Sequence, residues 1–308
     1  MFDLIRSIAD NRYRRVRRMV GRSGLATAVL GWFQSSARQL ETNRSANVVD
    51  TGGLSARLRF TCNICGTACD CPVSDLGRET PSCPTCASTV RLRSLARCLT
   101  LRLVGEPTVL AALPSTAVGI GLSDHPGLAQ ALESASKYTN TAYHQEPHLD
   151  ITAPALHWLS SADYLSSSDV FEHVIMPVQL AFDGAFKVLR PGGWLILTVP
   201  FGPIGSLPTT IEHFPDLHDW SIETADDGHK VVVNQRTDGT VERFEDPVFH
   251  GGDGFTLEMR IFEEQALVDH LRSAGFVDIS VHDESDLNWG IFWSNNRASV
   301  PISARRPS

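Results

Sequence analysis

The chain has 308 residues, of which 42% are hydrophobic and 20% are charged, so it is long enough for one α/β domain and a smaller module. Its formal net charge of -8 and pI near 5.7 argue against a protein that binds polyanions over its whole surface. A membrane-spanning helix needs roughly 20 apolar residues, and the best candidate, GLATAVLGWF at 24–33, has half that length. The sequence therefore predicts a globular protein, which we expect in the cytoplasm.

Residues 1–40 are predicted to form a basic helical arm, since its first 22 residues carry seven Arg against Asp3 and Asp10. A surface helix is the simpler interpretation, and peripheral contact with an anionic membrane is the alternative. A signal peptide fits less well, because the basic part is too long and Gly and Thr dilute the apolar part. Residues 41–57, which are polar and contain glycine, are predicted to be a linker.

Six of the seven cysteines lie within 62–86. Cys62-x2-Cys65 and Cys83-x2-Cys86 are separated by 17 residues, which is the spacing of a tetrahedral zinc site on two knuckles. A small residue follows each pair, in CNICG and CPTCA, and suits a tight turn. We therefore expect a zinc-ribbon-like module at 58–98 whose four thiolates hold a structural Zn²⁺.

Three cysteines remain outside this pattern. Cys69 and Cys71 are spare and could replace a zinc ligand, a choice that the spacing leaves open. A disulfide framework is the alternative for the whole segment, but it would be unusual beside a cytoplasmic α/β domain. Cys98, in a helical stretch, is expected to be a buried small hydrophobic residue.

From about residue 104 onward, short apolar runs alternate with helical periods, which predicts a largely parallel sheet. ADYLSSS at 162–168 is an expected strand, a helix is expected after 173, RPGG at 190–193 should end that helix, and WLILTVP should be a buried strand. SDVFEHV at 168–174 then lies at the carboxyl end of a strand, where open sheets bind ligands.

SDVFEHV, an amphipathic helix and LRPGGWLILTVP together resemble the central segment of class I S-adenosylmethionine-dependent methyltransferases. FEEQALVDHLRSAGFVDISVHD, a helix followed by a strand, resembles the last third of that superfamily. The resemblance covers about 105–305, with a poorly matched insertion at 200–260. It implies a Rossmann-like doubly wound α/β domain at 99–308, with a β-hairpin-containing lid insertion at 201–260.

The resemblance also implies positions for the S-adenosylmethionine cofactor. A glycine loop after the first strand corresponds to TAVGIGLSD, and an acidic residue after the second strand corresponds to Glu146. Asp150 and Ile151 in LDIT match the place of the adenine contact, and Asp169 lies at the rim. The usual third glycine is replaced by Ser-Asp-His, and only three residues separate Glu146 from Asp150, so a trimmed sheet edge is expected. The glycine-loop residues assigned to the cofactor are Gly119, Gly121, Ser123 and Asp124.

Methyl transfer needs mainly alignment of the acceptor and, for an OH or NH acceptor, removal of a proton. His173 is the candidate base, with Glu172 to orient it or to contact the cofactor, although a histidine that caps the next helix is the structural alternative. The predicted lid adds His213 and His250 as further catalytic candidates. His213 with Glu212, and His250, could bind a second metal, but no established motif spacing supports this.

The acceptor is weakly constrained, and a small molecule or a saccharide is the leading hypothesis. RNA or protein methylation through docking of the ribbon and the basic arm is the first alternative, although Phe60 is the only aromatic residue of the ribbon segment. A non-catalytic zinc-binding adaptor with a degenerate fold is the second. The acceptor atom, the oligomeric state and the role of the arm are not specified by the sequence.

Overall fold

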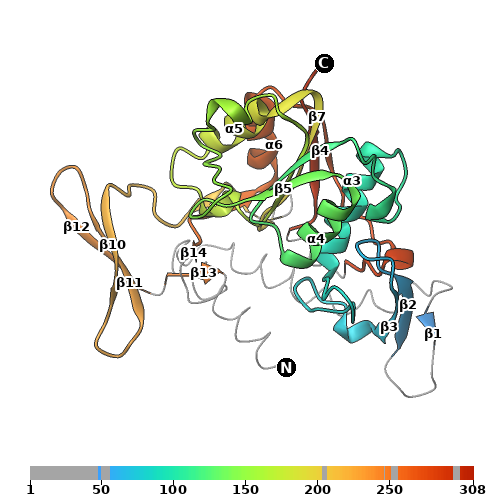
Figure 1. Ribbon diagram of the computed structural model, residues 1–308. Coiled ribbons are helices and arrows are strands. Elements are labelled where there is room, and N and C mark those ends of the chain that lie inside the picture. The colour runs from blue at the N-terminus through green and yellow to red at the C-terminus, as the bar shows by residue number, and fades with distance from the viewer. Residues whose placement is uncertain (1–47, 50–55, 203–206, 246, 251–255, 294–298) are drawn as a thin grey trace. The chain divides into compact units, whose positions relative to one another are not determined.

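The computed structural model describes residues 48–49, 56–202, 207–245, 247–250, 256–293 and 299–308 (Figure 1). The expected basic arm at 1–40 lies outside these residues, as does most of the expected linker. Within the linker, strand β1 (Val48–Val49) pairs antiparallel with β2 (Arg57–Thr61). Among the described helices, none combines the length and apolar character needed to cross a bilayer.

The main sheet has six strands in the order β16-β17-β7-β6-β4-β5. The four strands from β5 to β7 are parallel, whereas β17 is antiparallel to both of its neighbours. Their bounds are β4 Val118–Leu122, β5 Lys137–Thr141, β6 Ala162–Ser168, β7 Leu189–Thr198, β16 Val277–Val281 and β17 Ile302–Arg305. This mixed sheet confirms the expected Rossmann-like fold.

The chain reverses its direction of travel across the sheet at β4. From β4 it moves to β5 on one side, and it then returns to β6 on the other side. In open α/β sheets, ligands bind outside the carboxyl ends of the strands at such a switch point. The position to inspect is therefore the edge beyond Leu122 and Ser168, which are the last residues of β4 and β6.

Helices cover both faces of the main sheet (Figure 1). Helix α3 (Val90–Leu103) and helix α4 (Pro126–Ala135) share one core with Tyr138, Tyr164 and Ile196 of the strands. Helix α5 (Gln179–Val188) and helix α6 (Glu264–Ser273) share the other core with Leu165 and Leu195. Because successive strand residues point to opposite faces, neighbours such as Tyr164 and Leu165 belong to different cores.

The cysteine-rich module packs on the α3 side of the sheet. Strands β2 and β3 (Ala68–Pro72) form its hairpin, followed by the 3-10 turn η2 (Val73–Asp75) and by α3. Leu58 and Phe60 of β2 lie in the same core as α3 and Ile291. The expected boundary between residues 98 and 99 falls inside α3, so one helix belongs to both the ribbon-like segment and the sheet domain.

The insertion after β7 contains short strands and one antiparallel sheet of three strands, β10-β11-β12. Strand β15 pairs with both β8 and β9, and β13 pairs with β14. The bounds are β8 Phe201–Gly202, β9 Ile211–Glu212, β10 Asp219–Thr224, β11 Lys230–Gln235, β12 Val241–Glu245, β13 Phe249–His250, β14 Thr256–Leu257 and β15 Arg260–Glu263.

Two strand boundaries differ from the sequence prediction. The segment RPGG, which was expected to lie between helix and strand, is part of β7, which begins at Leu189. Gly192 in this segment adopts a φ of 83°, and its N–H bonds to the C-terminal segment. Strand β5 ends at Thr141, and Glu146 lies in an exposed turn rather than at the strand end. The remaining 3-10 turns are η3 Leu110–Ala112, η4 Leu156–Trp158, η5 Phe171–His173 and η7 Leu287–Trp289.

Candidate functional site

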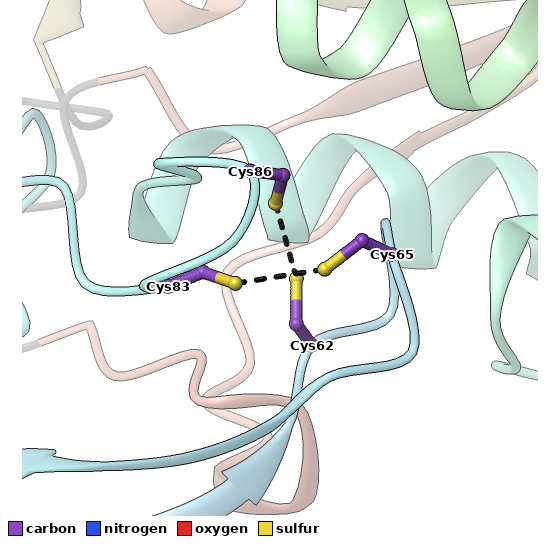
Figure 2. A group of neighbouring side chains, drawn as sticks. All are labelled: Cys62, Cys65, Cys83 and Cys86. Atoms are coloured by element: carbon purple, nitrogen blue, oxygen red, sulfur yellow. Dashed lines mark hydrogen bonds between the residues drawn. The ribbon is translucent and has the colours of Figure 1, made fainter.

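The four predicted zinc ligands converge (Figure 2). The sulfur atoms of Cys62, Cys65, Cys83 and Cys86 all lie within 4.8 Å of one another. The Cys62–Cys86 and Cys65–Cys83 sulfur pairs are each 3.6 Å apart. A regular tetrahedron with Zn–S bonds of about 2.3 Å has sulfurs about 3.8 Å apart. The cluster therefore has the size of a tetrahedral metal site.

The backbone around the cluster repeats itself in the two knuckles. Gly66 follows Cys65 with a φ of 78° and donates to the Cys62 carbonyl, and Ala87 follows Cys86 with a φ of 54° and donates to the Cys83 carbonyl. Cys69 and Cys71 lie in β3 with buried side chains and are not part of the cluster. The open choice of ligands is thus settled geometrically, and Cys98 is fully buried as predicted.

The thiols of the cluster have different pKa values. The hydrogen bond with Cys86 lowers the pKa of Cys62 to about 4, while the same contact, together with burial, raises the pKa of Cys86. Burial also raises the pKa of Cys65. The arrangement therefore holds protons that a metal ion must displace, so metal affinity should fall as the pH falls.

Arg93 links the cluster to the rest of the fold. Its fully buried guanidinium donates to the carbonyl oxygens of Ser88 and Gly290, both at 2.8 Å, and to two hydroxyl groups, those of Ser82 at 2.9 Å and Ser88 at 3.1 Å. It also lies 4.7 Å from the centre of the Phe60 ring. The second knuckle is thus tied to α3 and to a segment almost 200 residues later.

At the switch point, Asp124 follows β4 and is buried. One carboxylate oxygen accepts from Tyr138 Oη at 2.7 Å and from the Ser166 hydroxyl, while the other, Oδ1, has no hydrogen-bond partner. Ser167, beside Leu122 in the β4–β6 register, is also buried and its hydroxyl is unpartnered. Burial raises the pKa of Asp124. Two unsatisfied polar atoms at this edge fit a polar ligand better than a closed core.

The two predicted cofactor glycines face tyrosine rings. A Cβ on Gly119 would lie 2.1 Å from Tyr164 Cζ, and one on Gly121 would lie 1.7 Å from Tyr138 Oη. The packing of the tyrosines therefore already requires glycine at both positions. Ser123 has a φ of 54° and turns the chain into the buried Asp124. Within the predicted glycine loop, the Ser123–Asp124 turn is the part whose carboxylate has an oxygen without a hydrogen-bond partner.

The other predicted cofactor residues lie in the segment after β5. Glu146 is exposed and its Oε2 accepts from the His148 N–H at 2.9 Å. Asp150 caps its own turn, since Oδ1 accepts from the N–H and the hydroxyl of Thr152, and Ile151 is buried. A cofactor role for these three residues stays a prediction.

Asp169, with a φ of 56°, stands at the end of β6 and is bound by the cysteine-rich segment. Arg78 donates to its Oδ2, Arg91 Nε lies 3.4 Å from the same oxygen, and the Thr198 hydroxyl donates to Oδ1 at 2.8 Å. Arg91 also bonds Glu79 through two nitrogens and donates to the Ser168 hydroxyl. Asp169 is therefore paired with the cysteine-rich segment, and its role toward the cofactor stays a prediction.

Glu172 and His173 form the turn η5. Glu172 is completely buried, both of its carboxylate oxygens lack a hydrogen-bond partner, and burial followed by the charge of Asp169 raises its pKa well above the usual value. His173 Nδ1 bonds the Leu257 carbonyl at 2.9 Å, and burial lowers the pKa of His173. The helix-capping alternative is wrong, because no side chain caps α5.

His213 and His250 meet at Glu258. His213 Nε2 lies 3.1 Å from one oxygen of Glu258, and His250 Nε2 lies 2.8 Å from the other. The His250 ring also packs edge-on against His173, with ring centres 5.2 Å apart. Three of the four predicted catalytic residues, Glu172, His173 and His250, therefore come together, and His213 is buried behind Glu258.

Arg260 supports this arrangement from within. It is fully buried and donates to the carbonyls of Phe171 and Val174 at 3.0 and 2.5 Å and to Glu212 at 2.8 Å. Glu212 thus pairs with Arg260, and among the described residues no group of potential metal ligands combines it with His213, a combination that the sequence left without motif support. Arg260 lies in an insertion whose strand pairing could not be predicted. The sequence therefore gave no signal that this arginine would bond to the backbone of η5.

Comparison with known proteins found no protein-family model and no curated protein that matches the sequence. Among solved structures, Burkholderia thailandensis 1,6-didemethyltoxoflavin-N1-methyltransferase has a TM-score of 0.38 and 13% identity over 85% of this chain and 100% of its own. CalS10, an amino pentose methyltransferase from Micromonospora echinaspora, has a TM-score of 0.39 and 11% identity over 71% and 92%. The glycopeptide N-methyltransferase MtfA has a TM-score of 0.39 and 13% identity over 70% and 89%.

Proposed function

We propose that this chain, which has the fold of class I S-adenosylmethionine-dependent methyltransferases, is a cytoplasmic enzyme that methylates a small-molecule or saccharide-type acceptor. The observation that carries the proposal is the set of polar groups at the carboxyl ends of β4 and β6. Asp124 follows β4, Ser167 lies at the end of β6, and Glu172 and His173 follow β6, at the edge where open α/β sheets bind ligands. Buried polar atoms without partners at such a position favour a binding site.

The Ser123–Asp124 turn is the element that we expect to hold the amino-acid end of S-adenosylmethionine. The free Oδ1 of Asp124 can accept from the cofactor's ammonium group. Glu146 and Asp150, which follow β5, are the residues that the family resemblance assigns to the ribose and adenine. The bound cofactor supplies an activated methyl group, so the chain has to position the acceptor and exclude water.

His173 is placed to handle a proton of the acceptor. Because Nδ1 bonds the Leu257 carbonyl, the ring's lone pair lies on Nε2. Burial lowers the pKa of His173, which favours the neutral ring at pH 7. The ring is also not sealed, since 14% of its side-chain surface is exposed. A neutral and partly accessible imidazole is suited to accept a proton from a hydroxyl or amine.

The arginines of the ribbon support a small acceptor over RNA. Arg57 and Arg59 both pair with Asp70, Arg78 and Arg91 pair with Asp169 and Glu79, and Arg93 is buried. Arg97 pairs with Asp286. RNA docking depends on arginines that are available to phosphate, and in the described ribbon only Arg57 and Arg59, which share Asp70, have side chains more than 20% exposed. We assign the four-cysteine cluster a structural Zn²⁺, because four thiolates leave no open coordination position.

The test is calorimetric titration of the zinc-containing protein with S-adenosylmethionine and S-adenosylhomocysteine. Asp124→Asn keeps the shape and removes the charge, and it should weaken binding at least tenfold, about 1.4 kcal/mol. Asp227→Asn is the matched control, since Asp227 is exposed and pairs only with His229. Gly121→Arg is a poor probe, because it would collide with Tyr138.

Micromolar binding that Asp124→Asn weakens and Asp227→Asn preserves would support the enzyme and justify screening sugars and nucleotide sugars. If the folded protein bound neither compound, the methyltransferase proposal would be wrong, and a zinc-binding adaptor would be the better account. Binding of RNA that weakens steeply with salt would instead favour the RNA alternative.

A further inference from the structure

A second group of potential metal ligands lies apart from the four cysteines. Glu172, His173 and His250 each offer a ligand atom, and these atoms lie within 4.8 Å of one another. Glu172 and His173 come from η5 at the edge of the main sheet, whereas His250 comes from β13 in the insertion, 77 residues after His173 in the sequence. No local motif connects them, so the fold alone creates the group.

The hydrogen bonds of His173 prepare it as a ligand. Its Nδ1 donates to the Leu257 carbonyl at 2.9 Å, which leaves the Nε2 lone pair 3.7 Å from Glu172 Oε1. Histidines that bind metals almost always donate their other ring N–H to a carbonyl or carboxylate, which fixes the tautomer. His173 already has this arrangement.

Glu172 is the residue that calls for a cation. Its side chain is fully buried, and neither carboxylate oxygen receives a hydrogen bond. An ionised carboxylate in such surroundings costs several kcal/mol unless a positive charge compensates it. His173 Nε2, 3.7 Å from Glu172 Oε1, is too distant for a hydrogen bond but suitably placed to share one ion with Glu172.

The surroundings hold the three residues in position. Glu258 lies 2.8 Å from His250 Nε2 and 3.1 Å from His213 Nε2, as the outer carboxylate of a metal-binding histidine commonly does. Arg260 binds the carbonyls on both sides of the Glu172–His173 pair, and the Glu172 carbonyl accepts from the Met259 N–H at 2.9 Å. His250 retains 24% side-chain exposure, which provides access for an ion.

We propose that Glu172, His173 and His250 together bind one divalent transition-metal ion. Two imidazoles and one carboxylate suit zinc, iron or manganese better than magnesium or calcium, which prefer oxygen ligands alone. Three protein ligands leave coordination positions open, in contrast to the closed four-cysteine cluster. Under the proposed function, on which this role rests, an open position would take an acceptor oxygen beside the cofactor. The ion would then promote loss of the acceptor's proton in place of His173 Nε2, which would be a ligand.

The experiment uses the full chain with Zn²⁺ in the cysteine cluster and titrates it with Co²⁺. Cobalt in the new site should add one equivalent with visible d–d absorption and without thiolate charge-transfer absorption. His250→Gln and Glu172→Gln should each weaken this binding at least tenfold. His229→Gln is the matched control, because His229 lies in the insertion but bonds Asp227 and Glu245 instead.

The proposal would be overturned if the folded wild type bound no cobalt beyond the cysteine cluster, or if His250→Gln and Glu172→Gln bound it as the wild type does. His250→Gln replaces a partly exposed residue, so it provides the answer even if Glu172→Gln fails to fold. Titration of the same samples with S-adenosylmethionine separates the two proposals. Cobalt binding without cofactor binding would retain the metal site and remove the methyltransferase function.

Discussion

Replacing Arg93 by Met should detach the second knuckle from α3. The substitution keeps an unbranched side chain but removes the donor to the Gly290 carbonyl, whereas the Ser88 carbonyl still accepts from the N–H groups of Ser82 and Cys83. The two serine hydroxyls can turn to other partners, since Ser88 Oγ lies 3.3 Å from Cys62 Sγ and Ser82 Oγ lies 3.5 Å from the Ser88 carbonyl. The loss is therefore concentrated in the Gly290 carbonyl and in the contact with the Phe60 ring.

The expected magnitude follows from these contacts. The unsatisfied Gly290 carbonyl costs about 1–3 kcal/mol, and loss of the buried cation–π contact adds about 1–2 kcal/mol. Relief of the burial of a charge, which lowers the pKa of Arg93, offsets part of this sum. We expect the free energy of unfolding to fall by about 2–4 kcal/mol, the sum of these two losses less that relief.

Urea unfolding at pH 7 measures this change, and release of zinc to a chromogenic chelator measures the effect on the cluster. Arg57→Met is the matched control, because Arg57 is exposed and its pair with Asp70 should contribute about 0–1 kcal/mol. Arg93→Met should also speed zinc release, and the control should not. Equal unfolding energies for the two variants would refute the idea that Arg93 anchors the ribbon.

Three further predictions concern single positions. Ala87→Gly should stabilise the zinc-containing protein by about 0.5–1 kcal/mol in urea unfolding, because Ala87 has a φ of 54°; a loss of stability would contradict the strain. Gly121→Ala should destabilise it by at least about 1–3 kcal/mol, since its Cβ would meet Tyr138 Oη, and Tyr138→Leu in the same chain should recover part of that loss. Burial, then the charges of Arg102 and Arg97, lowers the pKa of His282 to about 4, so its stabilising contribution is full above about 6.5 and is lost as the pH falls through 4. His282→Gln should therefore flatten the loss of stability between pH 6.5 and 4, and equal slopes for both proteins would rule this out.

The features that sequence predicted well depend on residues close together in the chain. The spacing of the four cysteines was sufficient because each knuckle is a local turn, closed at Gly66 and Ala87. The strand ADYLSSS and the helix after η5 followed from local periodicity. These elements need no information about distant partners.

The features that sequence missed depend on distant pairs. Asp169 looks like an open rim carboxylate until Arg78, 91 residues earlier, is found beside it. The cofactor role of Gly119 and Gly121 stays a prediction, but the sequence did not reveal that tyrosines of β5 and β6 pack against both glycines. Likewise, nothing near His173 in the sequence reveals His250 or Leu257 as its neighbours. Such pairings require the register of the sheet and the path of the insertion.

The contact between Phe60 and Gly290 bears on how the protein is made. Any Cβ at Gly290 would lie 2.6 Å from the Phe60 ring, and the Gly290 carbonyl receives the Arg93 guanidinium. A ribosome adds about 5–20 residues per second, so Gly290 emerges roughly 10–40 s after Arg93. During that interval the nascent ribbon has its cysteines but not its complete apolar core. The cysteine module is thus translated early, but its apolar core is completed only after Gly290 has been made. Residues 58–98 expressed alone should therefore lack part of that core.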